Sequence, residues 1–114
     1  MNGKLQGHAQ RVQVPDGSVT ELTTVLNTET TADEINAAFK AAFSDTDYYG
    51  YNDEGIVSSD ILGDTHGGVF DPTQTDVNTI DGVTLARTVS FYDNEYGFTS
   101  NMIRTLLYFA EISE

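Results

Sequence analysis

The sequence predicts one α+β domain over residues 1–114, with a mixed, mostly antiparallel sheet and helices packed on one face. Residues 19–26 and 83–92 alternate apolar and polar side chains with the period of two that is typical of a strand with one buried face. Residues 31–43 and 95–110 instead repeat apolar side chains at helical spacing. A domain near this size buries roughly two-thirds of its unfolded surface, so one core is expected.

The charge balance excludes several classes of partner. Eighteen acidic residues against five basic ones give a formal charge of −13, which repels phosphate backbones and anionic membrane surfaces, so neither nucleic acid nor a membrane is an expected partner. No apolar run approaches the ~20 residues of a membrane span, and the N-terminus lacks a secretory hydrophobic region, so we expect a cytoplasmic protein. The chain has no cysteine, which excludes disulfides and a cysteine nucleophile.

The N-terminal region has the pattern of an antiparallel hairpin. Residues 4–14 alternate loosely and end at the turn signature Pro15-Asp16-Gly17-Ser18, after which residues 19–26 form a second β-rich segment. Arg11 would lie on the first of these strands. A single arginine on a strand is usually a salt-bridge partner or a surface residue whose stem covers apolar area.

The first predicted helix begins at a capping box. Thr31 and Glu34 have the spacing at which the hydroxyl and the carboxylate each satisfy a free amide at a helix start. The helix should end near Ser44, and we expect Phe39 and Phe43 to dock it on the sheet.

Two polar regions in the middle of the chain resemble metal or catalytic sites only superficially. The acidic loop 45–55 has Tyr49 where a calcium loop needs its fifth-position ligand, so we expect a solvated turn. His66 lies between Asp64 and Asp71, and we expect its ring to be hydrogen-bonded in a loop instead of acting as a general base. We predict no metal site, a short strand over 56–62 and a polar connection over 72–82.

The stretch 83–98 combines a strand, a polar corner and a helix start. Asn94 is a plausible helix cap and Glu95 a favourable first-turn anion. The helix that follows has apolar residues at helical spacing, namely Met102, Ile103, Leu106, Leu107 and Ala110.

Three stretches, in the same order, resemble phosphorylating glyceraldehyde-3-phosphate dehydrogenases. They are GKLQGHAQRVQVPDGSVTELT, then VSSD followed by DTH and FD, and finally SFYDNEYGF before an aliphatic C-terminal helix. Together they span nearly the whole chain, but they match only the C-terminal part of the catalytic domain, without the dinucleotide-binding domain. Phe91 and Phe98 stand where the family commonly has Trp and Tyr, and the second change removes a hydroxyl.

The resemblance implies a function and site residues. The family converts D-glyceraldehyde 3-phosphate and inorganic phosphate to 1,3-bisphosphoglycerate in glycolysis, using NAD, a cysteine nucleophile and a histidine base. Carried over to this sequence, Arg11 would bind substrate or inorganic phosphate, and Asn94 would hold the nicotinamide carboxamide with Tyr92 as a supporting residue. The chain lacks the cysteine, the GxGxxG loop and the segment with the catalytic histidine, so no catalytic residue is assigned and we expect the isolated chain to be inactive.

Two other possibilities remain open. The chain could be a non-catalytic binding or self-assembly module, since the family's catalytic-domain sheets form the main contacts of a homotetramer. Alternatively, a second chain could supply the missing half of the site.

The family's C-terminal helix packs against the absent cofactor domain, so here it would fold back onto the sheet or pair between copies. Met1 resembles a new start at the edge of an excised piece.

Overall fold

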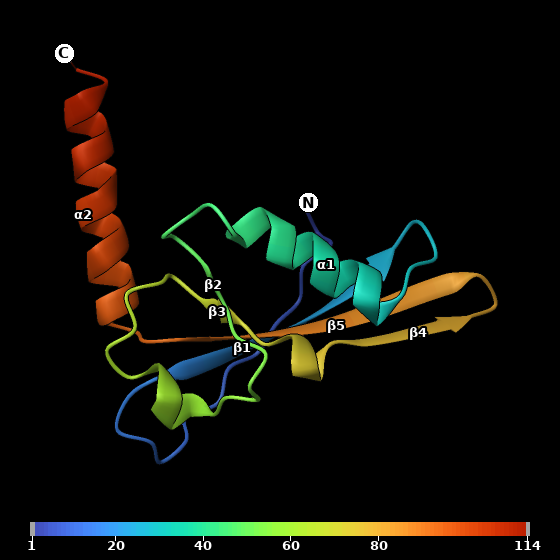
Figure 1. Ribbon diagram of the computed structural model, residues 1–114. Coiled ribbons are helices and arrows are strands. Elements are labelled where there is room, and N and C mark those ends of the chain that lie inside the picture. The colour runs from blue at the N-terminus through green and yellow to red at the C-terminus, as the bar shows by residue number, and fades with distance from the viewer. Residues whose placement is uncertain (1, 114) are drawn as a thin grey trace.

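The computed structural model describes residues 2–113, and its central element is the ten-residue strand β5 (Val83–Tyr92) (Figure 1). Strand β1 (Ser18–Leu26) pairs with β5 along one edge, while β4 (Asp76–Ile80) and β3 (Val69–Phe70) share the other edge, all antiparallel. The short strand β2 (Gly50–Tyr51) adds to β3 in parallel. The predicted α+β class with a mixed, mostly antiparallel sheet is therefore confirmed.

The buried positions of β5 change from one face of the sheet to the other along the strand. Near its start Thr84 and Ala86 are buried, and near its end Val89 and Phe91 are buried. Because successive residues of a strand point to opposite faces, these two pairs belong to different faces. The expectation of one buried face along the whole strand is therefore wrong, since each half of β5 is covered by a different element.

Helix α1 (Ala32–Phe43) covers the face that includes Ala86. Its predicted capping box is confirmed: the Glu34 amide donates to Thr31 Oγ1 at 3.2 Å, and the Glu34 carboxylate accepts from the Thr31 amide at 2.9 Å. The ring of Phe39 stacks on Phe70 with centroids 4.3 Å apart, which docks the helix on the sheet. Phe43 instead stacks on Tyr49 in the following loop.

The opposite face is covered by a short helix where a strand was predicted. Residues 56–62 contain the 3-10 helix η1 (Ser58–Ile61), because the Asp60 carboxylate accepts from the Val57 amide at 2.9 Å and favours a local turn over an extended ladder. Ile56 and Ile61 from this segment pack with three sheet residues, Val69, Val89 and Phe91. This segment thus contributes two of the five residues of the main hydrophobic cluster.

The predicted hairpin of residues 4–14 with 19–26 is wrong. Residues 4–14 form no regular element, and β1 takes its hydrogen-bonded partner from β5 instead. The apolar side chains of Leu5 and Val12 are 72% and 66% exposed, so the alternation there does not correspond to a buried face. A strand needs both a partner edge and a covering layer, and this segment finds neither among residues 2–113.

The expectation of a polar connection over residues 72–82 is also wrong. This stretch contains the short helix η2 (Pro72–Gln74) and β4, which forms a hairpin with β5. Asp81 and Gly82 at its tip have φ values of 51° and 78°, as a tight two-residue hairpin turn requires. The Asp-Gly pair therefore marks the turn of a hairpin, and not only the point where β5 begins.

Helix α2 (Tyr96–Glu111) stands to one side of the sheet and contacts the molecule mainly through its first turns (Figure 1). Gly97 is buried against the carbonyl oxygen of His66, and Arg104 donates to the Thr65 carbonyl at 2.7 Å. The later apolar residues are 46–60% exposed, namely Met102, Ile103, Leu106, Leu107, Tyr108, Phe109 and Ile112. Within the described chain, the helix does not fold back onto the sheet, and no helix there is long and apolar enough to cross a membrane.

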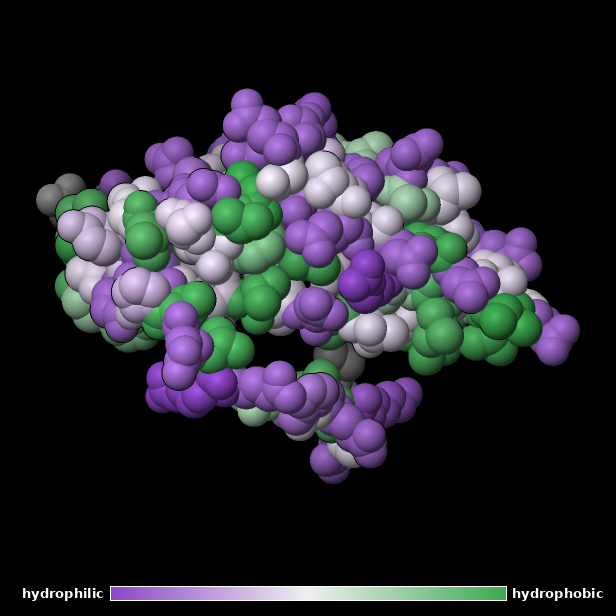
Figure 2. Space-filling view, turned by 90° about the horizontal axis from the view of Figure 1, so that it is seen from below, coloured by the Kyte–Doolittle hydropathy of each residue, from purple (hydrophilic) through white to green (hydrophobic). Residues whose placement is uncertain are grey.

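One end of the sheet also exposes apolar side chains on the face opposite α1. Figure 2 views this side and shows hydrophobic side chains gathered toward the end that the β4–β5 hairpin occupies. Val25, Ile80, Val83 and Leu85 are 69%, 61%, 51% and 41% exposed, and the strand register places them on one face. We call these four residues the sheet patch.

Candidate functional site

A pocket of about 510 Å³ lies between the stretch before β1 and the corner that joins β5 to α2. Arg11, Asp16 and Ser18 line it from the N-terminal side, and Asn94 and Glu95 line it from the corner. The structure thus brings together two of the three residues that the sequence predicts for the site. The third, Tyr92, is half-buried at the end of β5 and is not among the pocket-lining residues.

The corner is held in shape by Asp93, which is only 2% exposed. Its carboxylate accepts from the amides of Gly63 and Glu95 at 2.9 Å and of Tyr96 at 2.7 Å. The Gly63 amide first, and then the Tyr96 amide, hold the pKa of Asp93 below its ordinary value, because these bonds favour the charged form. The corner is therefore built around a buried carboxylate.

This arrangement corrects the expected helix start. The helix begins at Tyr96, so Glu95 occupies the cap position and not the first turn, and its side chain forms no capping bond. The amides at the helix start are satisfied by Asp93, one residue before Asn94. The prediction that Asn94 caps the helix is wrong, because the carboxylate of Asp93 accepts from these amides while the Asn94 side chain bonds Ser18.

The side chain of Asn94 instead contacts β1. Its amide oxygen accepts a hydrogen bond from the Ser18 hydroxyl at 2.9 Å. Ser18 is the first residue of β1 and pairs with Tyr92 in the β1–β5 register. Asn94 is therefore an exposed residue of the pocket lining, and within residues 2–113 its amide nitrogen donates to no other group.

Arg11 is exposed and is the one basic residue among those that line the pocket. In the described part of the chain its guanidinium takes part in no ion pair, unlike Arg87, which approaches Glu21 at 3.8 Å. The salt-bridge interpretation of Arg11 is therefore not supported within residues 2–113. A guanidinium in this position could bind a phosphate oxygen pair.

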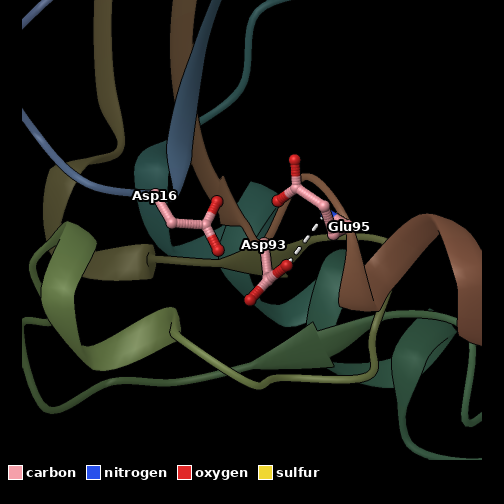
Figure 3. A group of neighbouring side chains, drawn as sticks. All are labelled: Asp16, Asp93 and Glu95. Atoms are coloured by element: carbon pink, nitrogen blue, oxygen red, sulfur yellow. Dashed lines mark hydrogen bonds between the residues drawn. The ribbon is translucent and has the colours of Figure 1, made fainter.

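Three carboxylates meet beside Asn94. Asp16, Asp93 and Glu95 offer oxygens that lie within 4.8 Å of one another, and Figure 3 shows Asp16 approaching the corner from the opposite segment. The hydrogen bond with Asp16 raises the pKa of Glu95 above its ordinary value, and burial and the two neighbouring negative charges act in the same direction. We assign no metal to the group.

His66 lies outside this site. Its Nδ1 is 2.7 Å from Asp64 Oδ1, and its backbone amide donates to the same oxygen at 2.8 Å, so the ring is hydrogen-bonded in its loop as expected. It lines a separate pocket of about 500 Å³ with Lys40 and Tyr51. Asp71 is buried and accepts from Thr73 and Gln74, so it does not gather with Asp64 around the imidazole.

Comparison with known proteins places the chain among dehydrogenase sequences. A family model described as "Glyceraldehyde 3-phosphate dehydrogenase, C-terminal domain" matches residues 1–94. A glyceraldehyde-3-phosphate dehydrogenase of Lactobacillus delbrueckii subsp. bulgaricus is 55% identical over 112 residues, which cover 98% of this chain and 32% of the relative. One of Streptococcus pyogenes serotype M1 is 54% identical over 114 residues, covering 100% and 33%. The chain thus spans about a third of the length of the curated relatives it matches.

Proposed function

The chain belongs to the family of glyceraldehyde 3-phosphate dehydrogenase C-terminal domains, and from this premise we propose that it supplies the phosphate and nicotinamide contacts of such an enzyme. The observation that carries the proposal is that Arg11 and Asn94, from opposite ends of the chain, line one pocket. In this proposal residues 1–114 form one domain, the C-terminal part of the catalytic domain, in a cytoplasmic glycolytic enzyme.

The reaction proposed for the whole enzyme couples oxidation of an aldehyde to transfer of the resulting acyl group to inorganic phosphate. D-glyceraldehyde 3-phosphate, inorganic phosphate and NAD⁺ give 1,3-bisphosphoglycerate, NADH and a proton. NAD, when bound, accepts the hydride from the aldehyde carbon. Arg11 binds phosphate oxygens through charge-assisted hydrogen bonds, Asn94 holds the nicotinamide carboxamide, and Tyr92 supports the strand end that positions Asn94.

The residues present fit the nicotinamide end of the cofactor. The amide of Asn94 can pair with a carboxamide, and the carboxylates of Asp16 and Glu95 in the same pocket favour the positive charge of the oxidised nicotinamide ring. The sequence contains neither a cysteine nor a glycine-rich dinucleotide loop, so the nucleophile and the adenine end must be supplied by other residues of the enzyme. We therefore propose that the 114-residue chain alone is inactive.

Self-assembly is the second candidate function. The sheet patch and the outer turns of α2 expose apolar side chains over two separate parts of the molecule. A second copy of this chain is the proposed occupant of the sheet patch, as part of a homo-oligomer that would be a tetramer in the whole enzyme.

The direct test joins this chain to the part of the Lactobacillus relative that precedes the matched segment. We call the product the joined enzyme. We expect the joined enzyme to reduce NAD with the triose phosphate and inorganic phosphate, and the isolated chain to show no such reaction. A folded joined enzyme without activity would contradict the proposal, as would an enzyme-like rate from the isolated chain. Adding the same preceding part as a separate polypeptide tests whether two chains can complete the site.

A further inference from the structure

We propose that Ser18 is a positioning residue that restrains the Asn94 side chain for nicotinamide binding. The inference rests on the proposed function and deepens it, because it concerns how the contact of Asn94 is set. The Ser18 hydroxyl donates to the amide oxygen of Asn94 at 2.9 Å, and both residues line the pocket. With the oxygen held, both hydrogens on the amide nitrogen are left for a ligand acceptor.

An asparagine amide has two orientations of nearly the same shape but opposite hydrogen-bonding character. One presents an acceptor to a ligand, and the other presents two donors. A nicotinamide carboxamide carries both an acceptor oxygen and a donor NH₂ group, and an Asn94 nitrogen turned toward the ligand would pair with the acceptor oxygen. In the structure the Ser18 hydroxyl donates to the Asn94 oxygen, so this is the orientation present.

The charges in the pocket favour the same orientation. Asp16 and Glu95 line it beside Asn94, and their carboxylates accept hydrogen bonds but, when ionised, cannot donate them. An amide oxygen turned toward them would meet like partial charge, whereas the amide nitrogen is attracted. The hydroxyl of Ser18 and the carboxylates of Asp16 and Glu95 therefore act on Asn94 within one pocket.

Both ends of the Ser18–Asn94 bond are anchored by the backbone. Ser18 is paired with Tyr92 in the β1–β5 ladder. Asn94 directly follows Asp93, whose carboxylate is fixed by the three amides of Gly63, Glu95 and Tyr96. The bond thus joins two rigid parts of the fold, so little further ordering is needed when a ligand binds.

The first measurement is the mobility of the Asn94 side-chain amide by ¹⁵N NMR relaxation on the 114-residue chain. We expect the amide to be as ordered as the backbone in the original chain and in Ser18→Thr, which keeps the hydroxyl. In Ser18→Ala it should become as mobile as the exposed amide of Asn78. Ser59→Ala, which removes an exposed hydroxyl from η1, is the matched control and should change nothing. An equally ordered Asn94 amide in Ser18→Ala would overturn the proposal.

The second measurement titrates the same variants with nicotinamide mononucleotide and follows the backbone amide signals of the residues that line the pocket. Ser18→Ala should weaken binding about threefold to tenfold, as expected for loss of one neutral hydrogen bond. Ser18→Thr should restore the affinity, and Ser18→Ala should add nothing in an Asn94→Ala background.

The two claims fail in different ways. If Asn94→Ala binds the nucleotide as well as the original chain, or if the original chain shows no saturable shift, the nicotinamide role of Asn94 is overturned and that of Ser18 with it. If Asn94→Ala weakens binding while the effect of Ser18→Ala is absent or simply additive, only the positioning role of Ser18 is overturned.

Discussion

Gly17 lies so close to Ser58 that a β-carbon built on it would stand 3.0 Å from the Ser58 carbonyl oxygen. The same β-carbon would stand 3.3 Å from the side chain of Ile61 in η1. Gly17 also has a φ of +88°, in the left-handed region that favours glycine. The residue immediately before Ser18 therefore sets where β1 begins and how closely η1 approaches it.

Gly17→Ala should destabilise the protein through both the backbone angle and the contact. We expect the free energy of unfolding to fall by roughly 2–3 kcal/mol, measured by denaturant titration. Gly55→Ala is the matched control, because Gly55 has a φ of +73° but nothing within 4 Å of its β-carbon position. It should lose only about 1 kcal/mol for the angle. Equal losses in the two variants would show that the approach to Ser58 does not constrain the fold.

Asp93→Asn should lower the thermal midpoint by several degrees at neutral pH. The lowered pKa of Asp93 means that its charged form stabilises the folded state at pH values above the ordinary pKa of an aspartate, and that this contribution is lost as the pH falls through the lowered pKa. The difference between the original chain and Asp93→Asn should therefore shrink toward acid pH. Asp45→Asn, at an exposed position, should show no such difference, and a gap for Asp93→Asn that is constant with pH would contradict this account.

The sheet patch predicts concentration-dependent self-association of the isolated chain. Leu85→Glu places a charge in the patch and should shift the chain toward monomer in sedimentation velocity experiments. Leu62→Glu is the matched control, since Leu62 is 47% exposed outside the patch and Leu85 is 41% exposed within it. A single monomeric species of the original chain over a wide concentration range would rule out the patch as a contact between copies.

The parts of the fold that the sequence predicts correctly are those whose signals are local. The capping box at Thr31 and Glu34 uses residues three apart. The alternation over ten consecutive residues correctly predicts the strand β5, although not which of its faces is buried. The errors arise where a distant partner decides the conformation. Residues 4–14 have a loose strand pattern but find no partner edge among residues 2–113. Residues 56–62 have an apolar pattern, but the Asp60 side chain favours a 3-10 helix there.

The candidate site likewise depends on contacts between residues that are far apart in the sequence. Arg11, Tyr92 and Asn94 were predicted by resemblance to a family, because no local pattern distinguishes a ligand-binding arginine or asparagine from an ordinary surface one. Their meeting, and the Ser18–Asn94 bond across 76 positions of sequence, depend on the β1–β5 pairing. The sequence predicts Asn94 as the helix cap, whereas the structure gives that role to Asp93, because the carboxylate of Asp93 is the side chain that turns toward the helix amides.

The central claim is that Arg11 binds phosphate and Asn94 binds nicotinamide in one pocket. The most direct test measures the Michaelis constants for inorganic phosphate and for NAD separately in the joined enzyme. Arg11→Gln should raise the KM for inorganic phosphate by about tenfold or more and leave the KM for NAD unchanged. Asn94→Ala should raise the KM for NAD about threefold to tenfold and leave the KM for phosphate unchanged. The matched variants Arg87→Gln and Asn78→Ala, both outside the pocket, should change neither constant. If Arg11→Gln and Asn94→Ala leave both constants unchanged, or move both together, the account is contradicted.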